Sequence, residues 1–427
     1  MKILFNNPEV LFQGKKYITV EDGIITAITD TMPNGRFDRV IDCRNRLLVT
    51  GMYNCHTHIP MTIFRGYGED LPLDRWLNEK IWPAEELLTP ESVYAASMFT
   101  ICEMLKNGIV SFSDMYNFCS DIARAVSETG IKANICRAVL CFDPTADLDN
   151  DERIREAREL YDEWNNACDG RIKIEMSLHA EYTNNEHSTR YVADMAKKYG
   201  TGLHIHMSET EKEHNECIAR HGLTPAGFFD KCGAFDVPVN AAHCVWVSDE
   251  DIALMAEKGV SVSHNPASNL KLGSGIARLK SLLDGGVNVA LGTDSNASNN
   301  TQDIMKEMYL AALLTKGTTY DPAGISTEQL IRLASANGAK LQGRADCGEI
   351  AVGKKADLVL IALDELHNFP VYDPSYAFLF SANSSDVRMT MVDGKILYEN
   401  GNFPTLDIEK IEHNMRCICA NYFKKEQ

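Results

Sequence analysis

Two histidines stand one residue apart in the stretch NCHTHIPM, directly after the apolar run LLVTGMY. Residues i and i+2 of a β-strand point to the same face, so His56 and His58 are expected to project together while Thr57 points away. A pair of imidazoles packs poorly in an apolar core but offers two nitrogen ligands to a metal ion. The pair therefore predicts half of a metal site whose other ligands lie further along the chain.

The ends of other apolar, β-like runs carry further candidate ligands. Seven of the 12 histidines stand at or near such ends: His56, His58, His179, His204, His206, His243 and His264. Asp294 ends the last run, although the turn GTDSNASNN could place an aspartate there for backbone reasons alone. In barrels of alternating strands and helices, the chemistry sits at the carboxyl ends of the strands. With His206, His243 and Asp294 at other strand ends, the set predicts that His56 and His58 belong to a metal site, and His204, one layer deeper than His206, is expected to be structural.

Three imidazoles and a carboxylate suit Zn²⁺ or Fe²⁺ better than Mg²⁺ or Ca²⁺. A catalytic site of this kind keeps one position for water and lowers the pKa of that water from ~15.7 toward ~7. Such a reaction also needs a base and an acid, and His243 and Glu209 are suitably spaced for these roles. The alternative for Glu209 is a carboxylate at the start of the next helix. The residues alone predict metal-dependent hydrolysis of a small molecule.

The elements that must position these residues alternate along the middle of the chain. Eight β-like runs are separated by helical stretches, of which Thr89 to Gly108 is the clearest, with Thr89 as N-cap, Pro90 in the first turn and Gly108 after the last. Over about 290 residues this pattern predicts an α/β fold, a (β/α)8 TIM-type barrel. A doubly wound open sheet is the alternative, but no G-x-G-x-x-G follows the first run. The runs are LLVTGMYNCHTHI, GIVSFSDM, IKANICRAVL, RIKIEMSLHAE, TGLHIHMSE, VPVNAAHCV, GVSVSHNPAS and GVNVALGTDS.

Both ends of the chain have a different, strand-rich texture. Short apolar runs flank the turn signals EDG at 21–23 and VDGK at 392–395. Because chain ends often lie close together, we expect one small β-sandwich domain built from both termini. The predicted division is 1–53 with 347–405 for this domain, 54–346 for the barrel, and 406–427 for a C-terminal helix packed on the body.

Bulk composition limits the classes of function. The 427 residues are 44% hydrophobic and 24% charged, with a net charge of −18. This charge argues against non-specific binding to nucleic acid and against an anionic membrane surface. No apolar run approaches the ~18 residues of a transmembrane helix, and the start MKILFNNPEV is no signal sequence. The 13 cysteines form no regular framework, so we expect reduced thiols and a cytoplasmic protein.

Long ordered motifs resemble the amidohydrolase superfamily, in the mononuclear metal branch of 5′-methylthioadenosine/S-adenosylhomocysteine deaminase-like enzymes. The matching pieces span nearly the whole chain: HTHIPMTIFRGYGEDLPLDRWLNEKIWPAE, SDMY, HMSET, AAHCV, SHNPASNLKLGSGIA and LGTDSNASNN. The resemblance implies one divalent metal, Zn²⁺ with Fe²⁺ as the alternative, bound by His56, His58, His206 and Asp294. It also implies that His243, assisted by Asp294, activates the water and that Glu209 carries the proton to the ring. Binuclear relatives use a lysine at the end of the fourth strand, whereas Lys173 stands at the start of that strand here, which favours a single metal.

The same resemblance implies where a substrate would bind. Trp76 and Glu85 match positions that face a nucleoside, with Glu85 on the ribose diol, although Glu85 could be a solvated helix carboxylate. His179 matches a contact to the purine or sugar, and Arg137 ends the third strand at a matching position. Arg153, with Arg155 as the alternative, matches a position for an amino-acid carboxylate. One departure is Glu181, where the family usually has proline; its carboxylate either joins the pocket or points into solvent.

The activity implied is hydrolytic deamination of an adenosine-type nucleoside: 5′-methylthioadenosine, S-adenosylhomocysteine, adenosine or 5′-deoxyadenosine. One alternative is an aminohydrolase acting on a pterin, guanine or triazine ring, and another is a catalytically silent metal-binding barrel. The expected partner is a small-molecule nucleoside or aminated heterocycle, with no nucleic acid and no membrane. Whether the chain forms a homo-oligomer is left open by the sequence.

Overall fold

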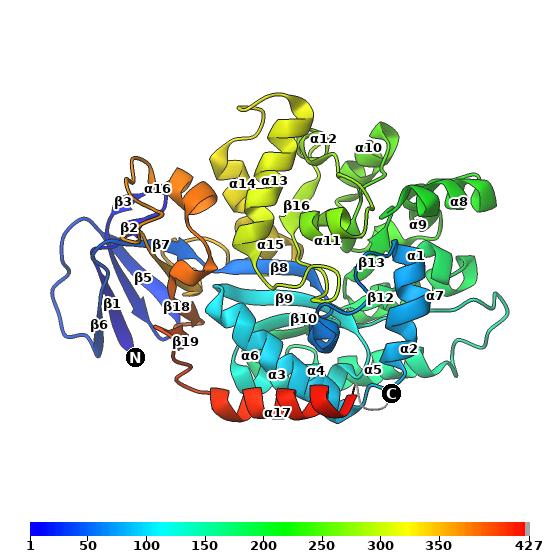
Figure 1. Ribbon diagram of the computed structural model, residues 1–427, viewed down its shortest axis with the longest axis horizontal. Coiled ribbons are helices and arrows are strands. Elements are labelled where there is room, and N and C mark those ends of the chain that lie inside the picture. The colour runs from blue at the N-terminus through cyan, green and yellow to red at the C-terminus, as the bar shows by residue number, and fades with distance from the viewer. Residues whose placement is uncertain (423–427) are drawn as a thin grey trace.

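The computed structural model describes residues 1–422, without the side chain of Asn421. An eight-stranded parallel barrel forms the larger part of the molecule, and a β-sandwich lies at one end of it (Figure 1). Among the described residues, no helix is long and apolar enough to cross a membrane. All 13 cysteines are free thiols.

The barrel confirms the predicted (β/α)8 fold. Its strands run in two hydrogen-bonded groups, β11-β10-β9-β8 and β12-β13-β14-β15-β16, and all of their pairings are parallel. The Asp294 backbone N–H donates to the His56 carbonyl (2.9 Å) across one seam between the groups. At the other seam, the fourth strand is divided into the pieces β11 and β12. Glu175 lies between them, and its backbone N–H donates to the Ile135 carbonyl (3.1 Å). The barrel strands are β8 (Met52–Thr57), β9 (Ile109–Tyr116), β10 (Lys132–Arg137), β11 (Ile172–Ile174), β12 (Met176–Leu178), β13 (Leu203–Met207), β14 (Val239–His243), β15 (Ser261–His264) and β16 (Asn288–Leu291).

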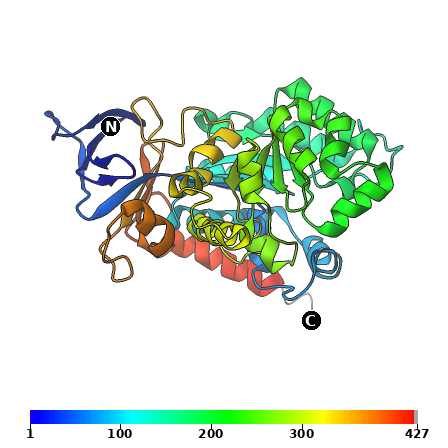
Figure 2. The ribbon, with the colours of Figure 1, turned by 90° about the horizontal axis from the view of Figure 1, so that it is seen from above.

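Helices connect these strands and surround the barrel (Figure 2). The predicted helix at 89–108 is confirmed as α3, whose N-cap residue Thr89 accepts a hydrogen bond from the Ser92 backbone N–H. The connecting elements are η1 (Ile59–Phe64), α1 (Leu73–Trp76), η2 (Leu77–Ile81), α2 (Trp82–Glu85), α3 (Pro90–Lys106), α4 (Cys119–Thr129), α5 (Glu152–Trp164), α6 (Ala167–Gly170), η3 (Glu181–Thr183), α7 (Glu186–Tyr199), α8 (Glu211–His221), α9 (Pro225–Lys231), η4 (Ala234–Asp236), α10 (Asp249–Lys258), α11 (Pro266–Lys271), α12 (Leu279–Asp284), α13 (Ile304–Thr319), α14 (Thr327–Leu333) and α15 (Ala336–Leu341).

Strands from both ends of the chain form the β-sandwich. One sheet has the order β5-β4-β1-β6 and the other β19-β18-β17-β7-β2-β3, so β7 pairs with β17 from the other end of the sequence. Both predicted hairpin turns are confirmed, with left-handed backbone at Asp22–Gly23 and Asp393–Gly394. The strands are β1 (Lys2–Asn6), β2 (Glu9–Val10), β3 (Gly14–Lys15), β4 (Tyr17–Glu21), β5 (Ile24–Thr29), β6 (Arg39–Asp42), β7 (Arg46–Thr50), β17 (Leu358–Ala362), β18 (Val387–Val392) and β19 (Lys395–Glu399), with α16 (Pro374–Tyr376), η5 (Ala377–Ser381) and η6 (Ser384–Asp386) between β17 and β18.

The β-like run LLVTGMYNCHTHI is shared between the sandwich and the barrel. The structure divides it at Gly51 into β7 of the sandwich and β8 of the barrel. A Cβ on Gly51 would lie 2.3 Å from Val110 Cγ1, so only glycine allows the chain to pass so close to β9. On β7, Leu48 packs into the sandwich core while Leu47 and Val49 pack into the barrel core. Because alternate residues of β7 pack into different cores, this strand connects the sandwich to β8, at whose end the first two histidines lie.

The C-terminal segment forms α17 (Ile408–Tyr422), which lies along the outside of the barrel (Figure 1). Its apolar residues Ile411, Met415 and Tyr422 are buried. The Tyr422 ring packs edge-on against Phe64 of η1, and its hydroxyl donates to the Ala84 carbonyl of α2. The domain boundaries 1–53 with 347–405, 54–346 and 406–427 remain our proposal; residues 423–427 lie outside the described residues.

Candidate active site

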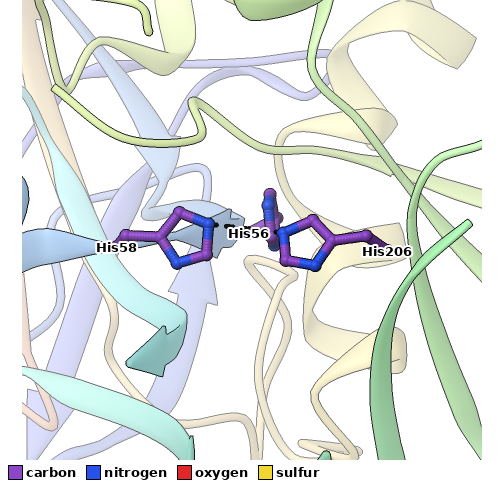
Figure 3. Close-up of side chains that lie close together, drawn as sticks. All are labelled: His56, His58 and His206. Carbon is purple, nitrogen blue, oxygen red and sulfur yellow. Dashed lines mark hydrogen bonds between the residues drawn. The ribbon is translucent and has the colours of Figure 1, made fainter. Parts of the chain in front are cut away.

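Three histidines meet at the carboxyl end of the barrel strands (Figure 3). His56 ends β8 with Thr57, His58 follows that strand directly, and His206 lies on β13. The Nε2 atoms of His58 and His206 are 3.4 Å apart. One ligand atom of each residue lies within 4.8 Å of the others, so the strand-end pattern does bring these rings together.

The opposite nitrogen of each ring is anchored by the barrel. A metal-binding histidine normally uses one nitrogen for the ion and fixes its ring through the other. The anchoring pairs are His56 Nδ1 with His204 Nε2 (2.9 Å), His58 Nδ1 with the Met115 carbonyl (2.5 Å), and His206 Nδ1 with the His179 carbonyl (2.7 Å). All three Nε2 atoms are therefore left facing the centre of the cluster. His204 is structural, as the spacing predicted, and it orients His56.

Asp294 brings a carboxylate to the same point, three residues after β16. Its Oδ1 lies 3.3 Å from His58 Nε2 and 3.5 Å from His56 Nε2. Its Oδ2 accepts hydrogen bonds from Ser268 Oγ (2.6 Å) and Ser298 Oγ (2.9 Å). The backbone at Asp294 is left-handed (φ 60°), which an aspartate tolerates better than most residues. These contacts aim Oδ1 at the histidines. Burial alone would raise the pKa of Asp294, but the nearby imidazoles lower it well below its ordinary value.

The residues present fit a divalent transition-metal ion. Nitrogen ligands ~2.0–2.1 Å from a tetrahedral zinc ion lie about 3.3–3.4 Å from one another, close to the separations found here. His56 Nε2 is buried and has no hydrogen-bond partner among the described residues, which a ligand bond would supply. Burial also lowers the pKa of His56 to about 3, keeping the ring neutral as a ligand must be. Lys173 lies away from the cluster, with its Nζ on the Gly343 carbonyl (2.6 Å).

Glu209 and His243 lie next to each other beside the cluster. His243 Nε2 lies 3.8 Å from Glu209 Oε2, while its Nδ1 is bound to Asn269 Oδ1 (2.8 Å). Burial raises the pKa of Glu209, and Ser274 Oγ donates to its Oε1 (3.3 Å). Burial alone would lower the pKa of His243, but the carboxylates of Glu209 and Asp294 raise it above its ordinary value. Glu209 is buried and precedes the N-cap of α8, so it is not a solvated first-turn carboxylate.

A cavity of about 480 Å³ opens onto this pair and the metal cluster, within the roughly 300–1,000 Å³ usual for small-molecule sites. Among its lining residues are His58, His206, Glu209, His243 and Asp294, together with the predicted substrate residues Trp76, Glu85, Arg137, Arg153 and His179. Burial raises the pKa of Glu85 to about 7, against the opposing effects of the Tyr116 hydroxyl and the Arg137 guanidinium. Glu85 is therefore part of a cavity wall and not a solvated helix carboxylate.

The two arginines of this wall differ in how they are paired. Arg137 donates to the carboxylate of Glu156 through Nε, and through Nη1 to Asn117 Oδ1 (2.6 Å) and the Ala138 carbonyl (2.8 Å). The guanidinium of Arg153 has no partner among the described residues. Arg155, the alternative to Arg153, does not line the cavity and is exposed beside Glu152 and Glu159.

Glu181 is the predicted cavity residue that the structure places elsewhere. It is buried and absent from the cavity wall. Its carboxylate accepts hydrogen bonds from Arg220 Nη2 (2.6 Å) and Nε (3.3 Å) and from His221 Nε2 (2.9 Å). The prediction of a substrate contact was wrong, because the Arg220 guanidinium and the His221 ring at the end of α8 hold this side chain away from the cavity. Its neighbour Tyr182 does line the cavity.

Several polar residues of the site were missed at the sequence level. Ser268 and Ser298 hold Asp294, Asn269 holds His243, and Ser274 holds Glu209. Ser268 and Asn269 lie on the short helix α11 after the seventh strand, whereas Ser274 follows that helix and Ser298 lies in the turn after the eighth strand, where serine and asparagine are common for backbone reasons. The only sequence signal was their position inside the motifs SHNPASNLKLGSGIA and LGTDSNASNN.

Comparisons with known proteins agree with this geometry. The profile of the Amidohydrolase family matches residues 47–397. A protein of Acetivibrio thermocellus named 5-methylthioadenosine/S-adenosylhomocysteine deaminase is 43% identical over 99% of this chain and 100% of its own length. A 5′-deoxyadenosine deaminase of Methanothermobacter thermautotrophicus is 40% identical over 95% of both chains. A crystal structure of an adenosine deaminase from Xanthomonas campestris with bound zinc superposes with a TM-score of 0.92 at 30% identity, covering 99% of this chain and 98% of that one.

Proposed function

The chain belongs to the amidohydrolase family, and we propose that it hydrolytically deaminates an adenosine-type nucleoside to the inosine analogue and ammonia. The candidate substrates are 5′-methylthioadenosine, S-adenosylhomocysteine, adenosine and 5′-deoxyadenosine. The observation that carries the proposal is the pairing of Glu209 with His243 beside the metal cluster, in a cavity that also presents Trp76 and Glu85.

We assign a single Zn²⁺, with Fe²⁺ as the alternative, to His56, His58, His206 and Asp294. When bound there, the ion supplies Lewis acidity that brings the pKa of a water molecule toward ~7. His243 Nε2 is the acceptor we propose for the proton of that water, and the Asp294 carboxylate assists it. Because Asn269 fixes the other nitrogen of His243, the ring can take this proton without turning.

Glu209 completes the proton transfer in this proposal. The water oxygen bonds to the ring carbon that carries the amino group, and Glu209 gives a proton to the adjacent ring nitrogen. The proton released by the water then reaches the amino group through His243 and Glu209, and the carbon–nitrogen bond breaks to release ammonia. The second proton of the water, left on the new hydroxyl group, returns to Glu209, which gives the ring carbonyl of the product and restores the protonated acid. Burial of Glu209 favours its protonated form, which suits a general acid.

The cavity wall supplies the contacts for a nucleoside. We propose that Glu85 accepts hydrogen bonds from the ribose hydroxyls, that Trp76 packs on the nucleoside, and that His179 contacts the purine or sugar. Arg137 and Arg153 then face the 5′ substituent.

Ammonia release by the zinc-loaded protein tests the proposal. The four adenosine-type substrates are expected to release ammonia, and guanine or a pterin is expected to react at least tenfold more slowly. A Glu209→Gln variant should lose turnover yet retain its metal, which separates proton transfer from metal binding. Absence of ammonia from all four nucleosides, with metal present, would overturn the assignment.

A further inference from the structure

The wall of the cavity formed by α5 and the end of β10 carries charges of both signs. Arg153 and Glu156 stand three residues apart on α5 and both line the cavity. Residues at this spacing are neighbours on one helix face, about 5–6 Å apart at Cβ. They form no ion pair with each other, and Glu156 is paired with Arg137 instead.

Each of these two side chains keeps hydrogen-bonding capacity toward the cavity. Among the described residues, Glu156 Oε1 has no hydrogen-bond partner, since Arg137 contacts only Oε2. The Arg153 guanidinium is likewise free, and only its backbone N–H is used, on Asp151 Oδ1 (2.9 Å). A guanidinium group with free N–H donors beside a free carboxylate oxygen is complementary to an amino-acid zwitterion, in which a carboxylate and an ammonium group lie next to each other.

We propose that Glu156 is a specificity residue that receives the α-ammonium group of an amino acid attached to the nucleoside through its 5′ sulfur. Arg153 faces the carboxylate of the same amino acid. Arg137 holds Glu156 in place and neutralises part of its charge. The substrate class is thus a nucleoside thioether with a free α-amino acid, and the inference rests on the proposed deamination.

Four thioether substrates that share the same adenosine part test the contributions of the amine and of the carboxylate separately. They are S-adenosylhomocysteine, its analogue without the amine, its analogue without the carboxylate, and 5′-propylthioadenosine, which lacks both groups and keeps the same carbon chain. The informative quantity is the ratio of kcat/KM between substrates that differ only in the amine. The ratio divides kcat/KM of the substrate with the amine by that of the substrate without it. In Glu156→Gln this ratio is expected to decrease about tenfold in both pairs, chiefly because KM of the substrate with the amine increases. A change of this size corresponds to the loss of one charge-assisted hydrogen bond.

Matched variants distinguish a direct contact from an indirect one. Arg153→Met is expected to reduce about tenfold the ratio of kcat/KM between substrates with and without the carboxylate. Glu152 is an exposed carboxylate on the same helix, so Glu152→Gln should change neither the amine ratios nor the carboxylate ratios. Amine ratios that stay within twofold in Glu156→Gln, or that rise, would overturn the inference, because Glu156 would then only neutralise Arg137. If the wild type deaminates 5′-methylthioadenosine without this pattern, the inference fails while the proposed function stands. Turnover of adenosine or 5′-deoxyadenosine but of none of the thioethers would also overturn the inference, whereas no turnover of any of these nucleosides would refute the proposed function.

Discussion

Replacement of Glu181 by glutamine is expected to destabilise the fold while leaving deamination within threefold of the wild type. The carboxylate is 1% exposed and accepts three hydrogen bonds, whereas its partners Arg220 and His221 are 39% and 23% exposed. Breaking a fully buried ion pair costs ~3–5 kcal/mol. Because Arg220 and His221 are partly exposed and can reach water once released, the expected loss is about 2–3 kcal/mol. At roughly 2 °C per kcal/mol for a chain of this size, the thermal midpoint should decrease by about 4–6 °C.

Differential scanning calorimetry of the metal-loaded protein measures this change, and ammonia release from 5′-methylthioadenosine measures the activity. Glu216→Gln is the matched control, since Glu216 also contacts Arg220 (3.4 Å) but is exposed, and its loss should cost at most about 1 kcal/mol. A Glu181→Gln variant with an unchanged midpoint and a tenfold lower kcat/KM would refute the reasoning. That result would mean that the carboxylate acts in the cavity and not in the ion-pair network.

Other predictions concern the metal, the substrate wall and the contact between barrel and sandwich. Ser268→Ala removes one of the hydroxyls that hold Asp294 and should weaken metal retention ~10–100-fold in a chelator competition, with little change in secondary structure by circular dichroism. Prolonged dialysis against a chelator should abolish ammonia release, and added Zn²⁺ should restore it; activity that survives complete metal removal would contradict the site. Since burial raises the pKa of Glu85 to about 7, its carboxylate ionises as the pH rises through that value, so KM for a nucleoside should fall between about pH 6 and about pH 8. Glu85→Gln should flatten this profile, and an identical profile in the variant would exclude Glu85 as the cause. Lys132→Met leaves the buried Asp357 without its cation (2.5 Å) and should cost about 3–5 kcal/mol in denaturant unfolding, whereas a loss below about 1 kcal/mol would contradict this burial argument.

The metal cluster was accessible from the sequence because two simple rules place it. Period-two alternation put His56 and His58 on one face, and strand ends of a barrel gather at one rim, which added His206 and Asp294. Both rules act on local pattern and need no knowledge of which loops touch. The roles of these residues in binding remain proposals, but their convergence is a feature of the fold.

Contacts between distant segments were not accessible in this way. Glu181 meets Arg220 and His221 about 40 residues later, and nothing in the local sequence distinguishes such a carboxylate from one that faces a cavity. Similarly, the sequence shows Gly51 only as a small residue within an apolar run and gives no sign that a strand ends there. Its importance comes from Val110 on the neighbouring strand, which excludes any side chain at that point and divides β7 from β8.

The left-handed backbone at His243 and Asp294 (φ 75° and 60°) restricts how this enzyme could change through mutation. β-Branched residues are strongly disfavoured in such a conformation, whereas asparagine and aspartate adopt it at low cost. Replacements at these two positions therefore carry a backbone penalty in addition to the chemical one. Cavity positions such as Phe142 and Arg153, which have ordinary backbone, carry no such penalty. We expect laboratory evolution toward a new ring or 5′ substituent to accumulate its changes there while the acid–base and metal positions stay fixed.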